Sequence, residues 1–81
     1  MSDMDIKQRV GNRVNALRQK ANLSITFLAY DSGIDPTYLC SVIRGERNIS
    51  LIYIQKISTA CGISVWEFFN DDNFSNNNIN N

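Results

Sequence analysis

The segment Ile25–Arg44 reads ITFLAYDSGIDPTYLCSVIR and decides how the rest of the chain must be arranged. Two short stretches with helical spacing of apolar residues meet at Gly33, a residue that takes a positive φ angle without steric cost. Ala29, four residues earlier, is small enough to let a second helix cross closely. Apolar residues stand at the other offsets that such a crossing needs: Leu28, Ile34, Leu39 and Val42. Together these features predict two short helices joined by a tight turn.

Clear start signals bound these helices and their neighbours. Residues suited to N-caps are Ser24, Asp35, Ser50 and Ser64, and Pro36 occupies a first helical position, where its missing N–H costs nothing. With caps included, helices are expected over about residues 5–20, 24–33, 35–45, 50–62 and 64–69. The sequence therefore predicts an all-α fold: a compact five-helix domain over residues 5–69. Residues 70–81 read NDDNFSNNNINN and are expected to form an Asn-rich disordered tail.

Helical periodicity predicts which side chains face the core. In the first helix the inward stripe is Ile6, Val10, Val14 and Leu17, and in the fourth it is Leu51, Ile54, Ile57 and Cys61. The basic residues of the first helix fall off its stripe. Arg9, Arg13 and Lys20 are accordingly interpreted as a solvated helix face rather than as direct contacts.

Composition excludes several classes of protein. The chain has 81 residues, enough for one domain with one core, and 43% of them are hydrophobic. No apolar run approaches the roughly 20 residues that span a bilayer, and the start of the chain is too polar for a secretory signal. Two cysteines, Cys40 and Cys61, and no histidine argue against a disulfide framework and a zinc site. We expect a cytoplasmic protein with reduced thiols, no metal, no cofactor and no evident small-molecule ligand.

Charge and chemistry narrow the function further. The net charge is zero, which by itself argues against a nucleic-acid partner. All eight Lys and Arg residues, however, lie between Lys7 and Lys56 with only three acidic residues among them, a local net charge of +5. The sequence has no catalytic histidine, no paired carboxylates at useful spacing and no glycine-rich phosphate loop, so an enzyme is not expected.

Several short motifs match one known family. They are VGNRVNALR at 10–18, LS at 23–24, LA at 28–29, GI at 33–34, TYL at 37–39, RG at 44–45, RN at 47–48, SL at 50–51, Ile57, CGIS at 61–64 and FF at 68–69. With them the chain resembles the phage-repressor/Cro-like (Xre-type) helix-turn-helix transcriptional regulators, whose fold is the lambda-repressor-like DNA-binding domain. The Thr-Tyr pair and the Arg-Asn loop resemble the controller proteins of restriction–modification systems. The likeness covers about three quarters of the chain.

The resemblance implies double-stranded DNA as the partner and the third helix as the element that enters the major groove. The residues expected to contact DNA are Ser24, Thr26, Pro36, Thr37, Tyr38, Ser41, Arg44, Arg47, Asn48 and Ser50. Thr37 and Ser41 are expected at base edges or phosphate. Arg44 and Arg47 suit phosphate or a guanine edge. Tyr38 is equally compatible with a half-buried packing role, and Arg47 with a solvated loop charge.

A pseudo-palindromic site read by a homodimer is the expected assembly. Its interface is predicted at Ile52, Tyr53, Trp66 and Phe69, although Trp66 and Phe69 could instead close the core. Two departures from the family pattern leave an alternative open. Ile25 stands where a DNA-contacting glutamine is common, and Ile43 replaces a glutamate that pairs with Arg18. The alternative is a protein-binding module on the same scaffold, similar to an antitoxin or antirepressor.

Overall fold

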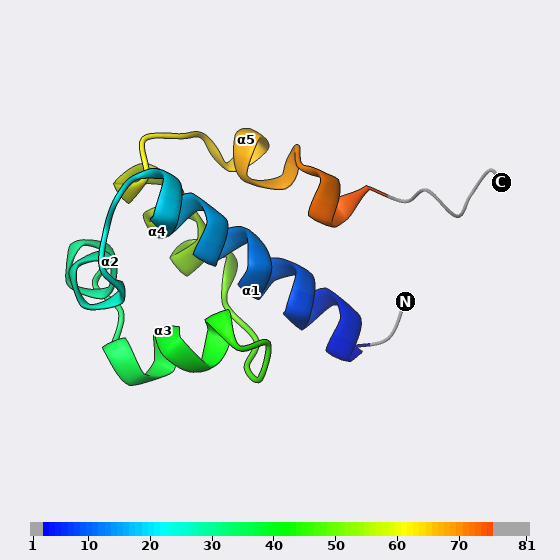
Figure 1. The fold of residues 1–81 in the computed structure, drawn as a ribbon, viewed down its shortest axis with the longest axis horizontal. Coiled ribbons are helices and arrows are strands. Elements are labelled where there is room, and N and C mark those ends of the chain that lie inside the picture. Colours follow the sequence, from blue (N-terminus) through cyan, green and yellow to red (C-terminus); the bar gives the residue numbers. More distant parts are fainter. Residues whose placement is uncertain (1–2, 76–81) are drawn as a thin grey trace, which may run out of the picture.

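The computed structural model describes residues 3–75, and the regular elements in that part of the chain are all helices, as predicted (Figure 1). Its elements are α1 (Asp3–Lys20), α2 (Ile25–Ser32), α3 (Pro36–Ile43), α4 (Leu51–Ala60), α5 (Val65–Phe69) and the short 3-10 helix η1 (Asp72–Phe74). α1 runs along the middle of the molecule. α3 lies on one side of it, and α5 and η1 lie on the other. Within residues 3–75 every helix is too short or too polar to cross a membrane.

The helices begin where the sequence places their caps. A side-chain oxygen accepts the backbone N–H three residues ahead at Ser24, Asp35, Ser50 and Ser64. Glu67 completes a reciprocal capping box with Ser64. Each such cap stabilises its helix by about 1 kcal/mol, because it satisfies an N–H group that has no partner inside the helix.

The turn between α2 and α3 has the predicted geometry. Gly33 has a φ angle of 70°, and the N–H of Ile34 donates to the carbonyl of Ala29 at 2.8 Å. Ala29 is completely buried where the two helices meet. A larger side chain at this position would force α2 and α3 apart, so the angle of the pair depends on it.

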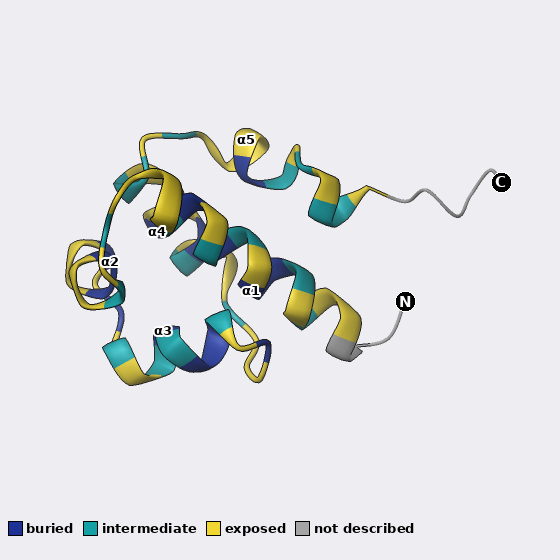
Figure 2. Ribbon diagram, viewed as in Figure 1, coloured by how far each residue is buried: buried dark blue, intermediate teal, exposed yellow. Residues whose placement is uncertain are grey.

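The core forms where α1, α2, α3, α4 and α5 converge, and its fully buried members include Val14, Leu28, Leu39, Ile57 and Phe68. Two residues predicted to face this core do not. Ile6 remains 39% exposed and Leu51 76% exposed. Both lie in the first turns of their helices. The start of α1 is exposed or half-buried, and its buried residues begin at Val10 (Figure 2). Periodicity gives a direction around the helix axis but not the length over which other elements cover it.

A glycine inside α1 sets how closely that helix approaches α3. A Cβ atom at Gly11 would lie 2.4 Å from the carbonyl oxygen of Val42 and 2.7 Å from that of Ile43. These are backbone atoms at the end of α3, and they cannot move without moving the helix. The direct contact between α1 and the end of α3 therefore requires glycine at this position, a requirement that the sequence pattern did not reveal.

The predicted disordered tail is wrong for residues 70–75. Phe74 packs against Phe68 and Phe69, with ring centroids 6.1 and 5.0 Å away. The Arg13 guanidinium forms a 3.0 Å ion pair with Asp71. η1 thereby packs beside α1. An asparagine-rich composition suggests disorder, but the Phe74 ring and the Asp71 carboxylate attach this segment to α5 and α1. Residues 76–81 lie outside the described residues.

The same contacts correct the prediction for Arg9 and Arg13. Arg13 donates to the carbonyl of Phe68 at 2.8 Å and to that of Glu67 at 2.7 Å. Arg9 donates to the carbonyl of Asn73 at 2.9 Å. Neither is a purely solvated charge, because both satisfy backbone carbonyls of the C-terminal segment. Lys20 is exposed, as predicted.

Candidate nucleic-acid interface

α3 presents one edge to solvent because its other edge is anchored in the core. Leu39 and Val42 are buried, whereas Thr37 is exposed and Pro36 and Cys40 are half-buried. The Pro36–Thr37 corner therefore faces outward, as the sequence predicts. A hollow of about 350 Å³ adjoins this edge and is lined by Asp35, Thr37, Tyr38, Ser41, Arg44, Glu46 and Arg47.

Ser41 was predicted to lie on the same outward face, and the structure corrects this. It is only 8% exposed, and its hydroxyl donates to the carbonyl of Tyr38 at 2.7 Å. The reason is that the chain folds back at the end of α3, where the N–H of Glu46 donates to the Ser41 carbonyl at 2.9 Å. The edge of α3 that reaches solvent in the second turn carries Cys40 instead.

Tyr38 packs inside the molecule as one of its two predicted roles requires. Its hydroxyl donates to the backbone carbonyl of Asn48, and its ring meets the ring of Tyr53 edge to face at 6.1 Å. It is half-buried and packs against the core. Tyr38 thus ties α3 to the loop over residues 46–50 and fixes where the side chains of that loop emerge.

The two arginines after α3 differ in their surroundings. Arg44 is paired with Glu46, at 3.2 Å, and also donates to the sulfur of Cys40 at 3.3 Å. Arg47 is exposed and, among the described residues, has no hydrogen-bonding or ion-pair partner. An exposed guanidinium without a partner can bind a phosphate without first breaking an internal contact.

The remaining candidate contacts lie at helix starts and do not line the same hollow. Ser24 and Ser50 use their hydroxyl oxygens as caps of α2 and α4, accepting from Phe27 at 3.0 Å and Tyr53 at 3.1 Å. Thr26 and the Asn48 side chain are exposed. The first turns of α2 and α4 carry unpaired N–H groups and the positive end of the helix dipole, which favour an anion such as phosphate.

The residues that depart from the family pattern make other contacts within the chain. Arg18, which lacks a glutamate partner, donates to the carbonyl of Leu23 at 2.8 Å and to the side-chain oxygen of Asn15 at 2.8 Å. Ile43 and Ile25 are half-buried and pack against the core. The loss of the ion pair therefore leaves Arg18 engaged within the chain, and it holds the loop between α1 and α2.

The four predicted interface residues fall into two groups. Ile52 is 64% exposed and Trp66 71% exposed, and no element within residues 3–75 covers them. Tyr53 and Phe69 are half-buried, and each packs against another aromatic ring of the same chain. Next to Ile52 lies the exposed Leu51, which the prediction assigned to the core. Beyond them is a mostly apolar hollow of about 210 Å³, lined by Ile6, Lys7, Val10, Arg47, Asn48, Ile49, Ile54 and Phe69.

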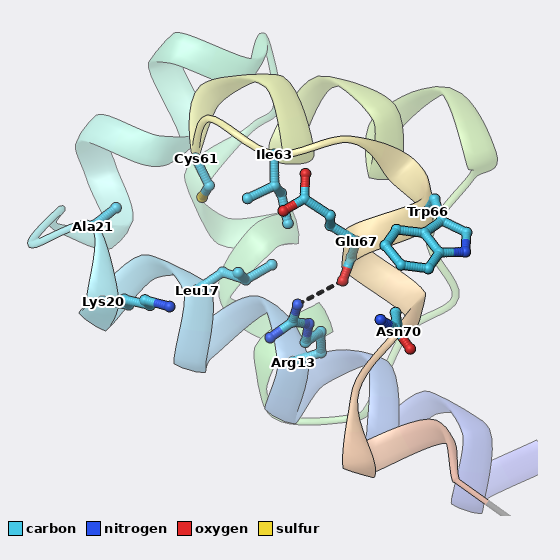
Figure 3. Close-up of a pocket in the computed structure, with 9 residues that line it drawn as sticks. All are labelled: Arg13, Leu17, Lys20, Ala21, Cys61, Ile63, Trp66, Glu67 and Asn70. Carbon is cyan, nitrogen blue, oxygen red and sulfur yellow. Dashed lines mark hydrogen bonds between the residues drawn. The ribbon is translucent and has the colours of Figure 1, made fainter.

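A separate hollow of about 430 Å³ lies between α1 and the segment over residues 61–70 (Figure 3). Arg13 crosses it to the carbonyl of Glu67, and the Trp66 ring lies at its edge. Cys61 also lines it, and burial raises the pKa of this thiol, so the thiol stays protonated at neutral pH. Both cysteines are free, and within residues 3–75 no group of three potential metal ligands exists.

Comparison with known proteins agrees with this geometry. A family model described as helix-turn-helix matches residues 14–68. The control protein C.MunI of a Mycoplasma species is 43% identical over 68 residues, which cover 83% of this chain and 92% of that protein. The control protein C.BamHI of Bacillus amyloliquefaciens is 38% identical over 60 residues, covering 73% of this chain and 74% of that protein.

A solved structure gives the same result. The restriction-modification controller protein C.AhdI from Aeromonas hydrophila superimposes with a TM-score of 0.74 and 41% identity, over 78% of this chain and 96% of that one. The matches include both helices of the motif, the loop that carries Arg47 and most of the core. The chain therefore belongs to the helix-turn-helix (Xre-type) family of DNA-binding transcriptional regulators, which are not enzymes.

Proposed function

We propose that this protein controls transcription of a restriction–modification system by inserting α3 into the major groove of a specific operator. The observation that carries the proposal is the outward corner of α3 at Thr37, flanked by the Arg47 guanidinium, which has no partner in the described part of the chain. Thr37 can hydrogen-bond a base or place its methyl against thymine, and Arg47 can bind phosphate. The identity to the control proteins C.MunI and C.BamHI supports the choice of system.

Phosphate contacts in this proposal come from Arg47 and from the starts of two helices. Ser24 with Thr26 would bind at the start of α2, and Asn48 with Ser50 at the start of α4. These contacts hold the protein in register but carry no sequence information, so recognition depends on the few groups at the outward edge of α3. Tyr38 contributes by fixing the loop that presents Asn48.

One α3 helix reads only a few base pairs, and we infer that two copies bind together. The apolar start of α4, Leu51 with Ile52, is exposed beside the hollow lined by Ile6, Ile49 and Phe69. Two such surfaces brought together by a two-fold axis would bury these side chains. Trp66, exposed on α5, is a further candidate for the contact. A dimer of this kind must present its two α3 helices about 34 Å apart to reach successive major grooves.

Selection of bound sequences from a pool of random DNA duplexes tests the proposal. The expected result is one enriched motif with two inverted half-sites whose centres are about one helical turn apart. Enrichment of a single unpaired half-site would contradict the dimer while leaving DNA reading intact. If no sequence is enriched, and if the binding of the protein to duplex DNA does not weaken as the salt concentration rises, the alternative of a protein-binding module is favoured.

A further inference from the structure

A charge pair stands beside the edge of α3 that is proposed to read DNA. The Nε and Nη2 atoms of Arg44 both lie 3.2 Å from the same carboxylate oxygen of Glu46, and Nη1 lies 3.3 Å from the sulfur of Cys40. All three guanidinium nitrogens are therefore engaged. Both charged side chains nevertheless remain more than half exposed. The guanidinium is held in one place while it still faces solvent.

The turn after α3 places Glu46 beside Arg44. Gly45 follows α3 with a φ angle of 79°, and its N–H donates to the carbonyl of Val42 at 2.9 Å. The next N–H, that of Glu46, donates to the carbonyl of Ser41 at 2.9 Å. This helix ending uses a left-handed glycine to satisfy the last free carbonyls, and it fixes the direction of the chain that follows. Glu46 is thus tied to the end of α3 through its backbone N–H.

The hollow beside α3 is balanced in charge, which is unusual for a surface that binds phosphate. Arg44 and Arg47 contribute two positive charges, and Asp35 and Glu46 contribute two negative charges. The Asp35 carboxylate accepts the N–H of Tyr38 at 3.1 Å as a helix cap, so its presence has a structural reason. The Glu46 carboxylate has no such role, and it would repel a phosphate placed against Arg44.

A base pair differs from a phosphate because it offers both acceptors and donors. In the major groove, guanine presents two acceptors that suit an arginine, and cytosine presents an amino group that donates to a carboxylate. A guanine–cytosine pair therefore matches Arg44 and Glu46 together, whereas a phosphate matches only Arg44.

We propose that Glu46 is a specificity-determining residue, which orients Arg44 toward a guanine–cytosine pair and opposes binding to the phosphate backbone alone. The proposal rests on the proposed DNA-reading function of this surface. In this proposal the Glu46 carboxylate increases the preference of the protein for its operator over other duplexes. Removing the charge should therefore make the protein bind more tightly and less selectively.

The test compares Glu46→Gln with the wild type on the selected operator and on a random duplex of equal length. The expected result is roughly three- to tenfold tighter binding to the random duplex, because one repulsive charge is lost and Arg44 is freed for phosphate. Operator affinity should rise less or fall, so the ratio of the two affinities decreases. The matched control is Asp31→Asn, the same change of charge on α2, in a different hollow. It should leave the ratio unchanged.

A second variant separates charge from shape. Glu46→Asp keeps the negative charge, so its affinity for the random duplex should stay within about twofold of the wild type. Two results would overturn the proposal. In the first, Glu46→Asp binds the random duplex as tightly as Glu46→Gln does. In the second, Glu46→Gln has the same ratio of operator to random-duplex affinity as Asp31→Asn. A wild type that binds operator and random duplex equally would overturn both this inference and the proposed function.

Discussion

The arginines of this protein form two groups with opposite surroundings. On α1, Arg9, Arg13 and Arg18 all donate to backbone carbonyls of other segments. After α3, Arg44 is paired with an exposed carboxylate and Arg47 has no partner among the described residues. Basic residues are therefore not equivalent candidates for DNA contact. Those on α1 hold the fold through bonds to carbonyls of other segments. The two after α3 stay exposed, and Arg47, which has no partner within residues 3–75, is available to a ligand.

The largest expected effect is at Gly11, where α1 contacts the end of α3. Alanine is favoured over glycine in a helix by about 1 kcal/mol. A Cβ here, however, would lie 2.4 Å from the carbonyl oxygen of Val42, so α1 and α3 must separate. We expect Gly11→Ala to lower the free energy of unfolding by about 3 kcal/mol or more and to weaken operator binding as well. Urea denaturation measures the first and a binding titration the second.

The control is Asn12→Ala, the neighbouring exposed position on the same helix. It should be neutral or slightly stabilising, because it gains helix propensity without a clash. Equal behaviour of the two variants would mean that the close contact between α1 and α3 is not required.

Arg13→Met should give the next largest effect, and it should fall on stability alone. The change removes the donors to Phe68 and Glu67 and leaves Asp71 without its ion-pair partner. We expect a loss of about 2–4 kcal/mol in the free energy of unfolding, measured by urea denaturation. Arg47→Met removes the same charge from an exposed side chain and should change stability by less than about 0.5 kcal/mol. A larger loss of stability for Arg47→Met than for Arg13→Met would contradict the division of the arginines into those that hold the fold and those available to DNA.

Thr37→Ala should affect recognition and leave the fold unchanged. Thr37 is exposed at the outward corner of α3 and has no role in the core. We expect discrimination between the operator and a single-base variant of it to fall by about three- to tenfold, as is typical for loss of one base contact. Competition binding with the two duplexes measures this. Thr59→Ala, an exposed threonine on α4, is the control and should discriminate like the wild type.

Asp71→Asn should give the smallest effect, visible as a change in pH dependence. The backbone N–H of Asn73, with a contribution from Arg13, holds the pKa of the Asp71 carboxyl below its ordinary value. A carboxyl with a lowered pKa in the folded state stabilises the protein above its ordinary pKa, and this contribution is lost as the pH falls through the lowered value. Thermal unfolding from neutral to acidic pH should therefore vary less for Asp71→Asn. Parallel curves would contradict this role.

Much of the fold was predictable because its signals are local. Caps at Ser24, Asp35, Ser50 and Ser64 and the glycine turn at Gly33 depend on neighbouring residues only, and the structure confirms them. The predictions that failed depend on distant parts of the chain. The carbonyls that Arg13 binds belong to α5, and Leu51 is exposed because no later element within the described residues covers it. The tight space at Gly11, which depends on α3, was not predicted.

The candidate site was predictable to the same extent. The resemblance to the family implied that Thr37 faces outward, and Thr37 is exposed in the structure. Ser41 was misplaced because its burial depends on the chain folding back after α3, and the pairing of Arg44 with Glu46 depends on the same turn. Spacing along a helix predicts direction, whereas burial and pairing require knowledge of what lies opposite.

The most direct test of the two kinds of arginine is the salt dependence of operator binding. The slope of the logarithm of the association constant against the logarithm of salt concentration counts the phosphates that a protein neutralises, at about 0.9 for each. Arg47→Ala should reduce the steepness of this slope by about 0.9, whereas Arg9→Met should leave it unchanged. A reduced slope for Arg9→Met with an unchanged slope for Arg47→Ala would contradict the account.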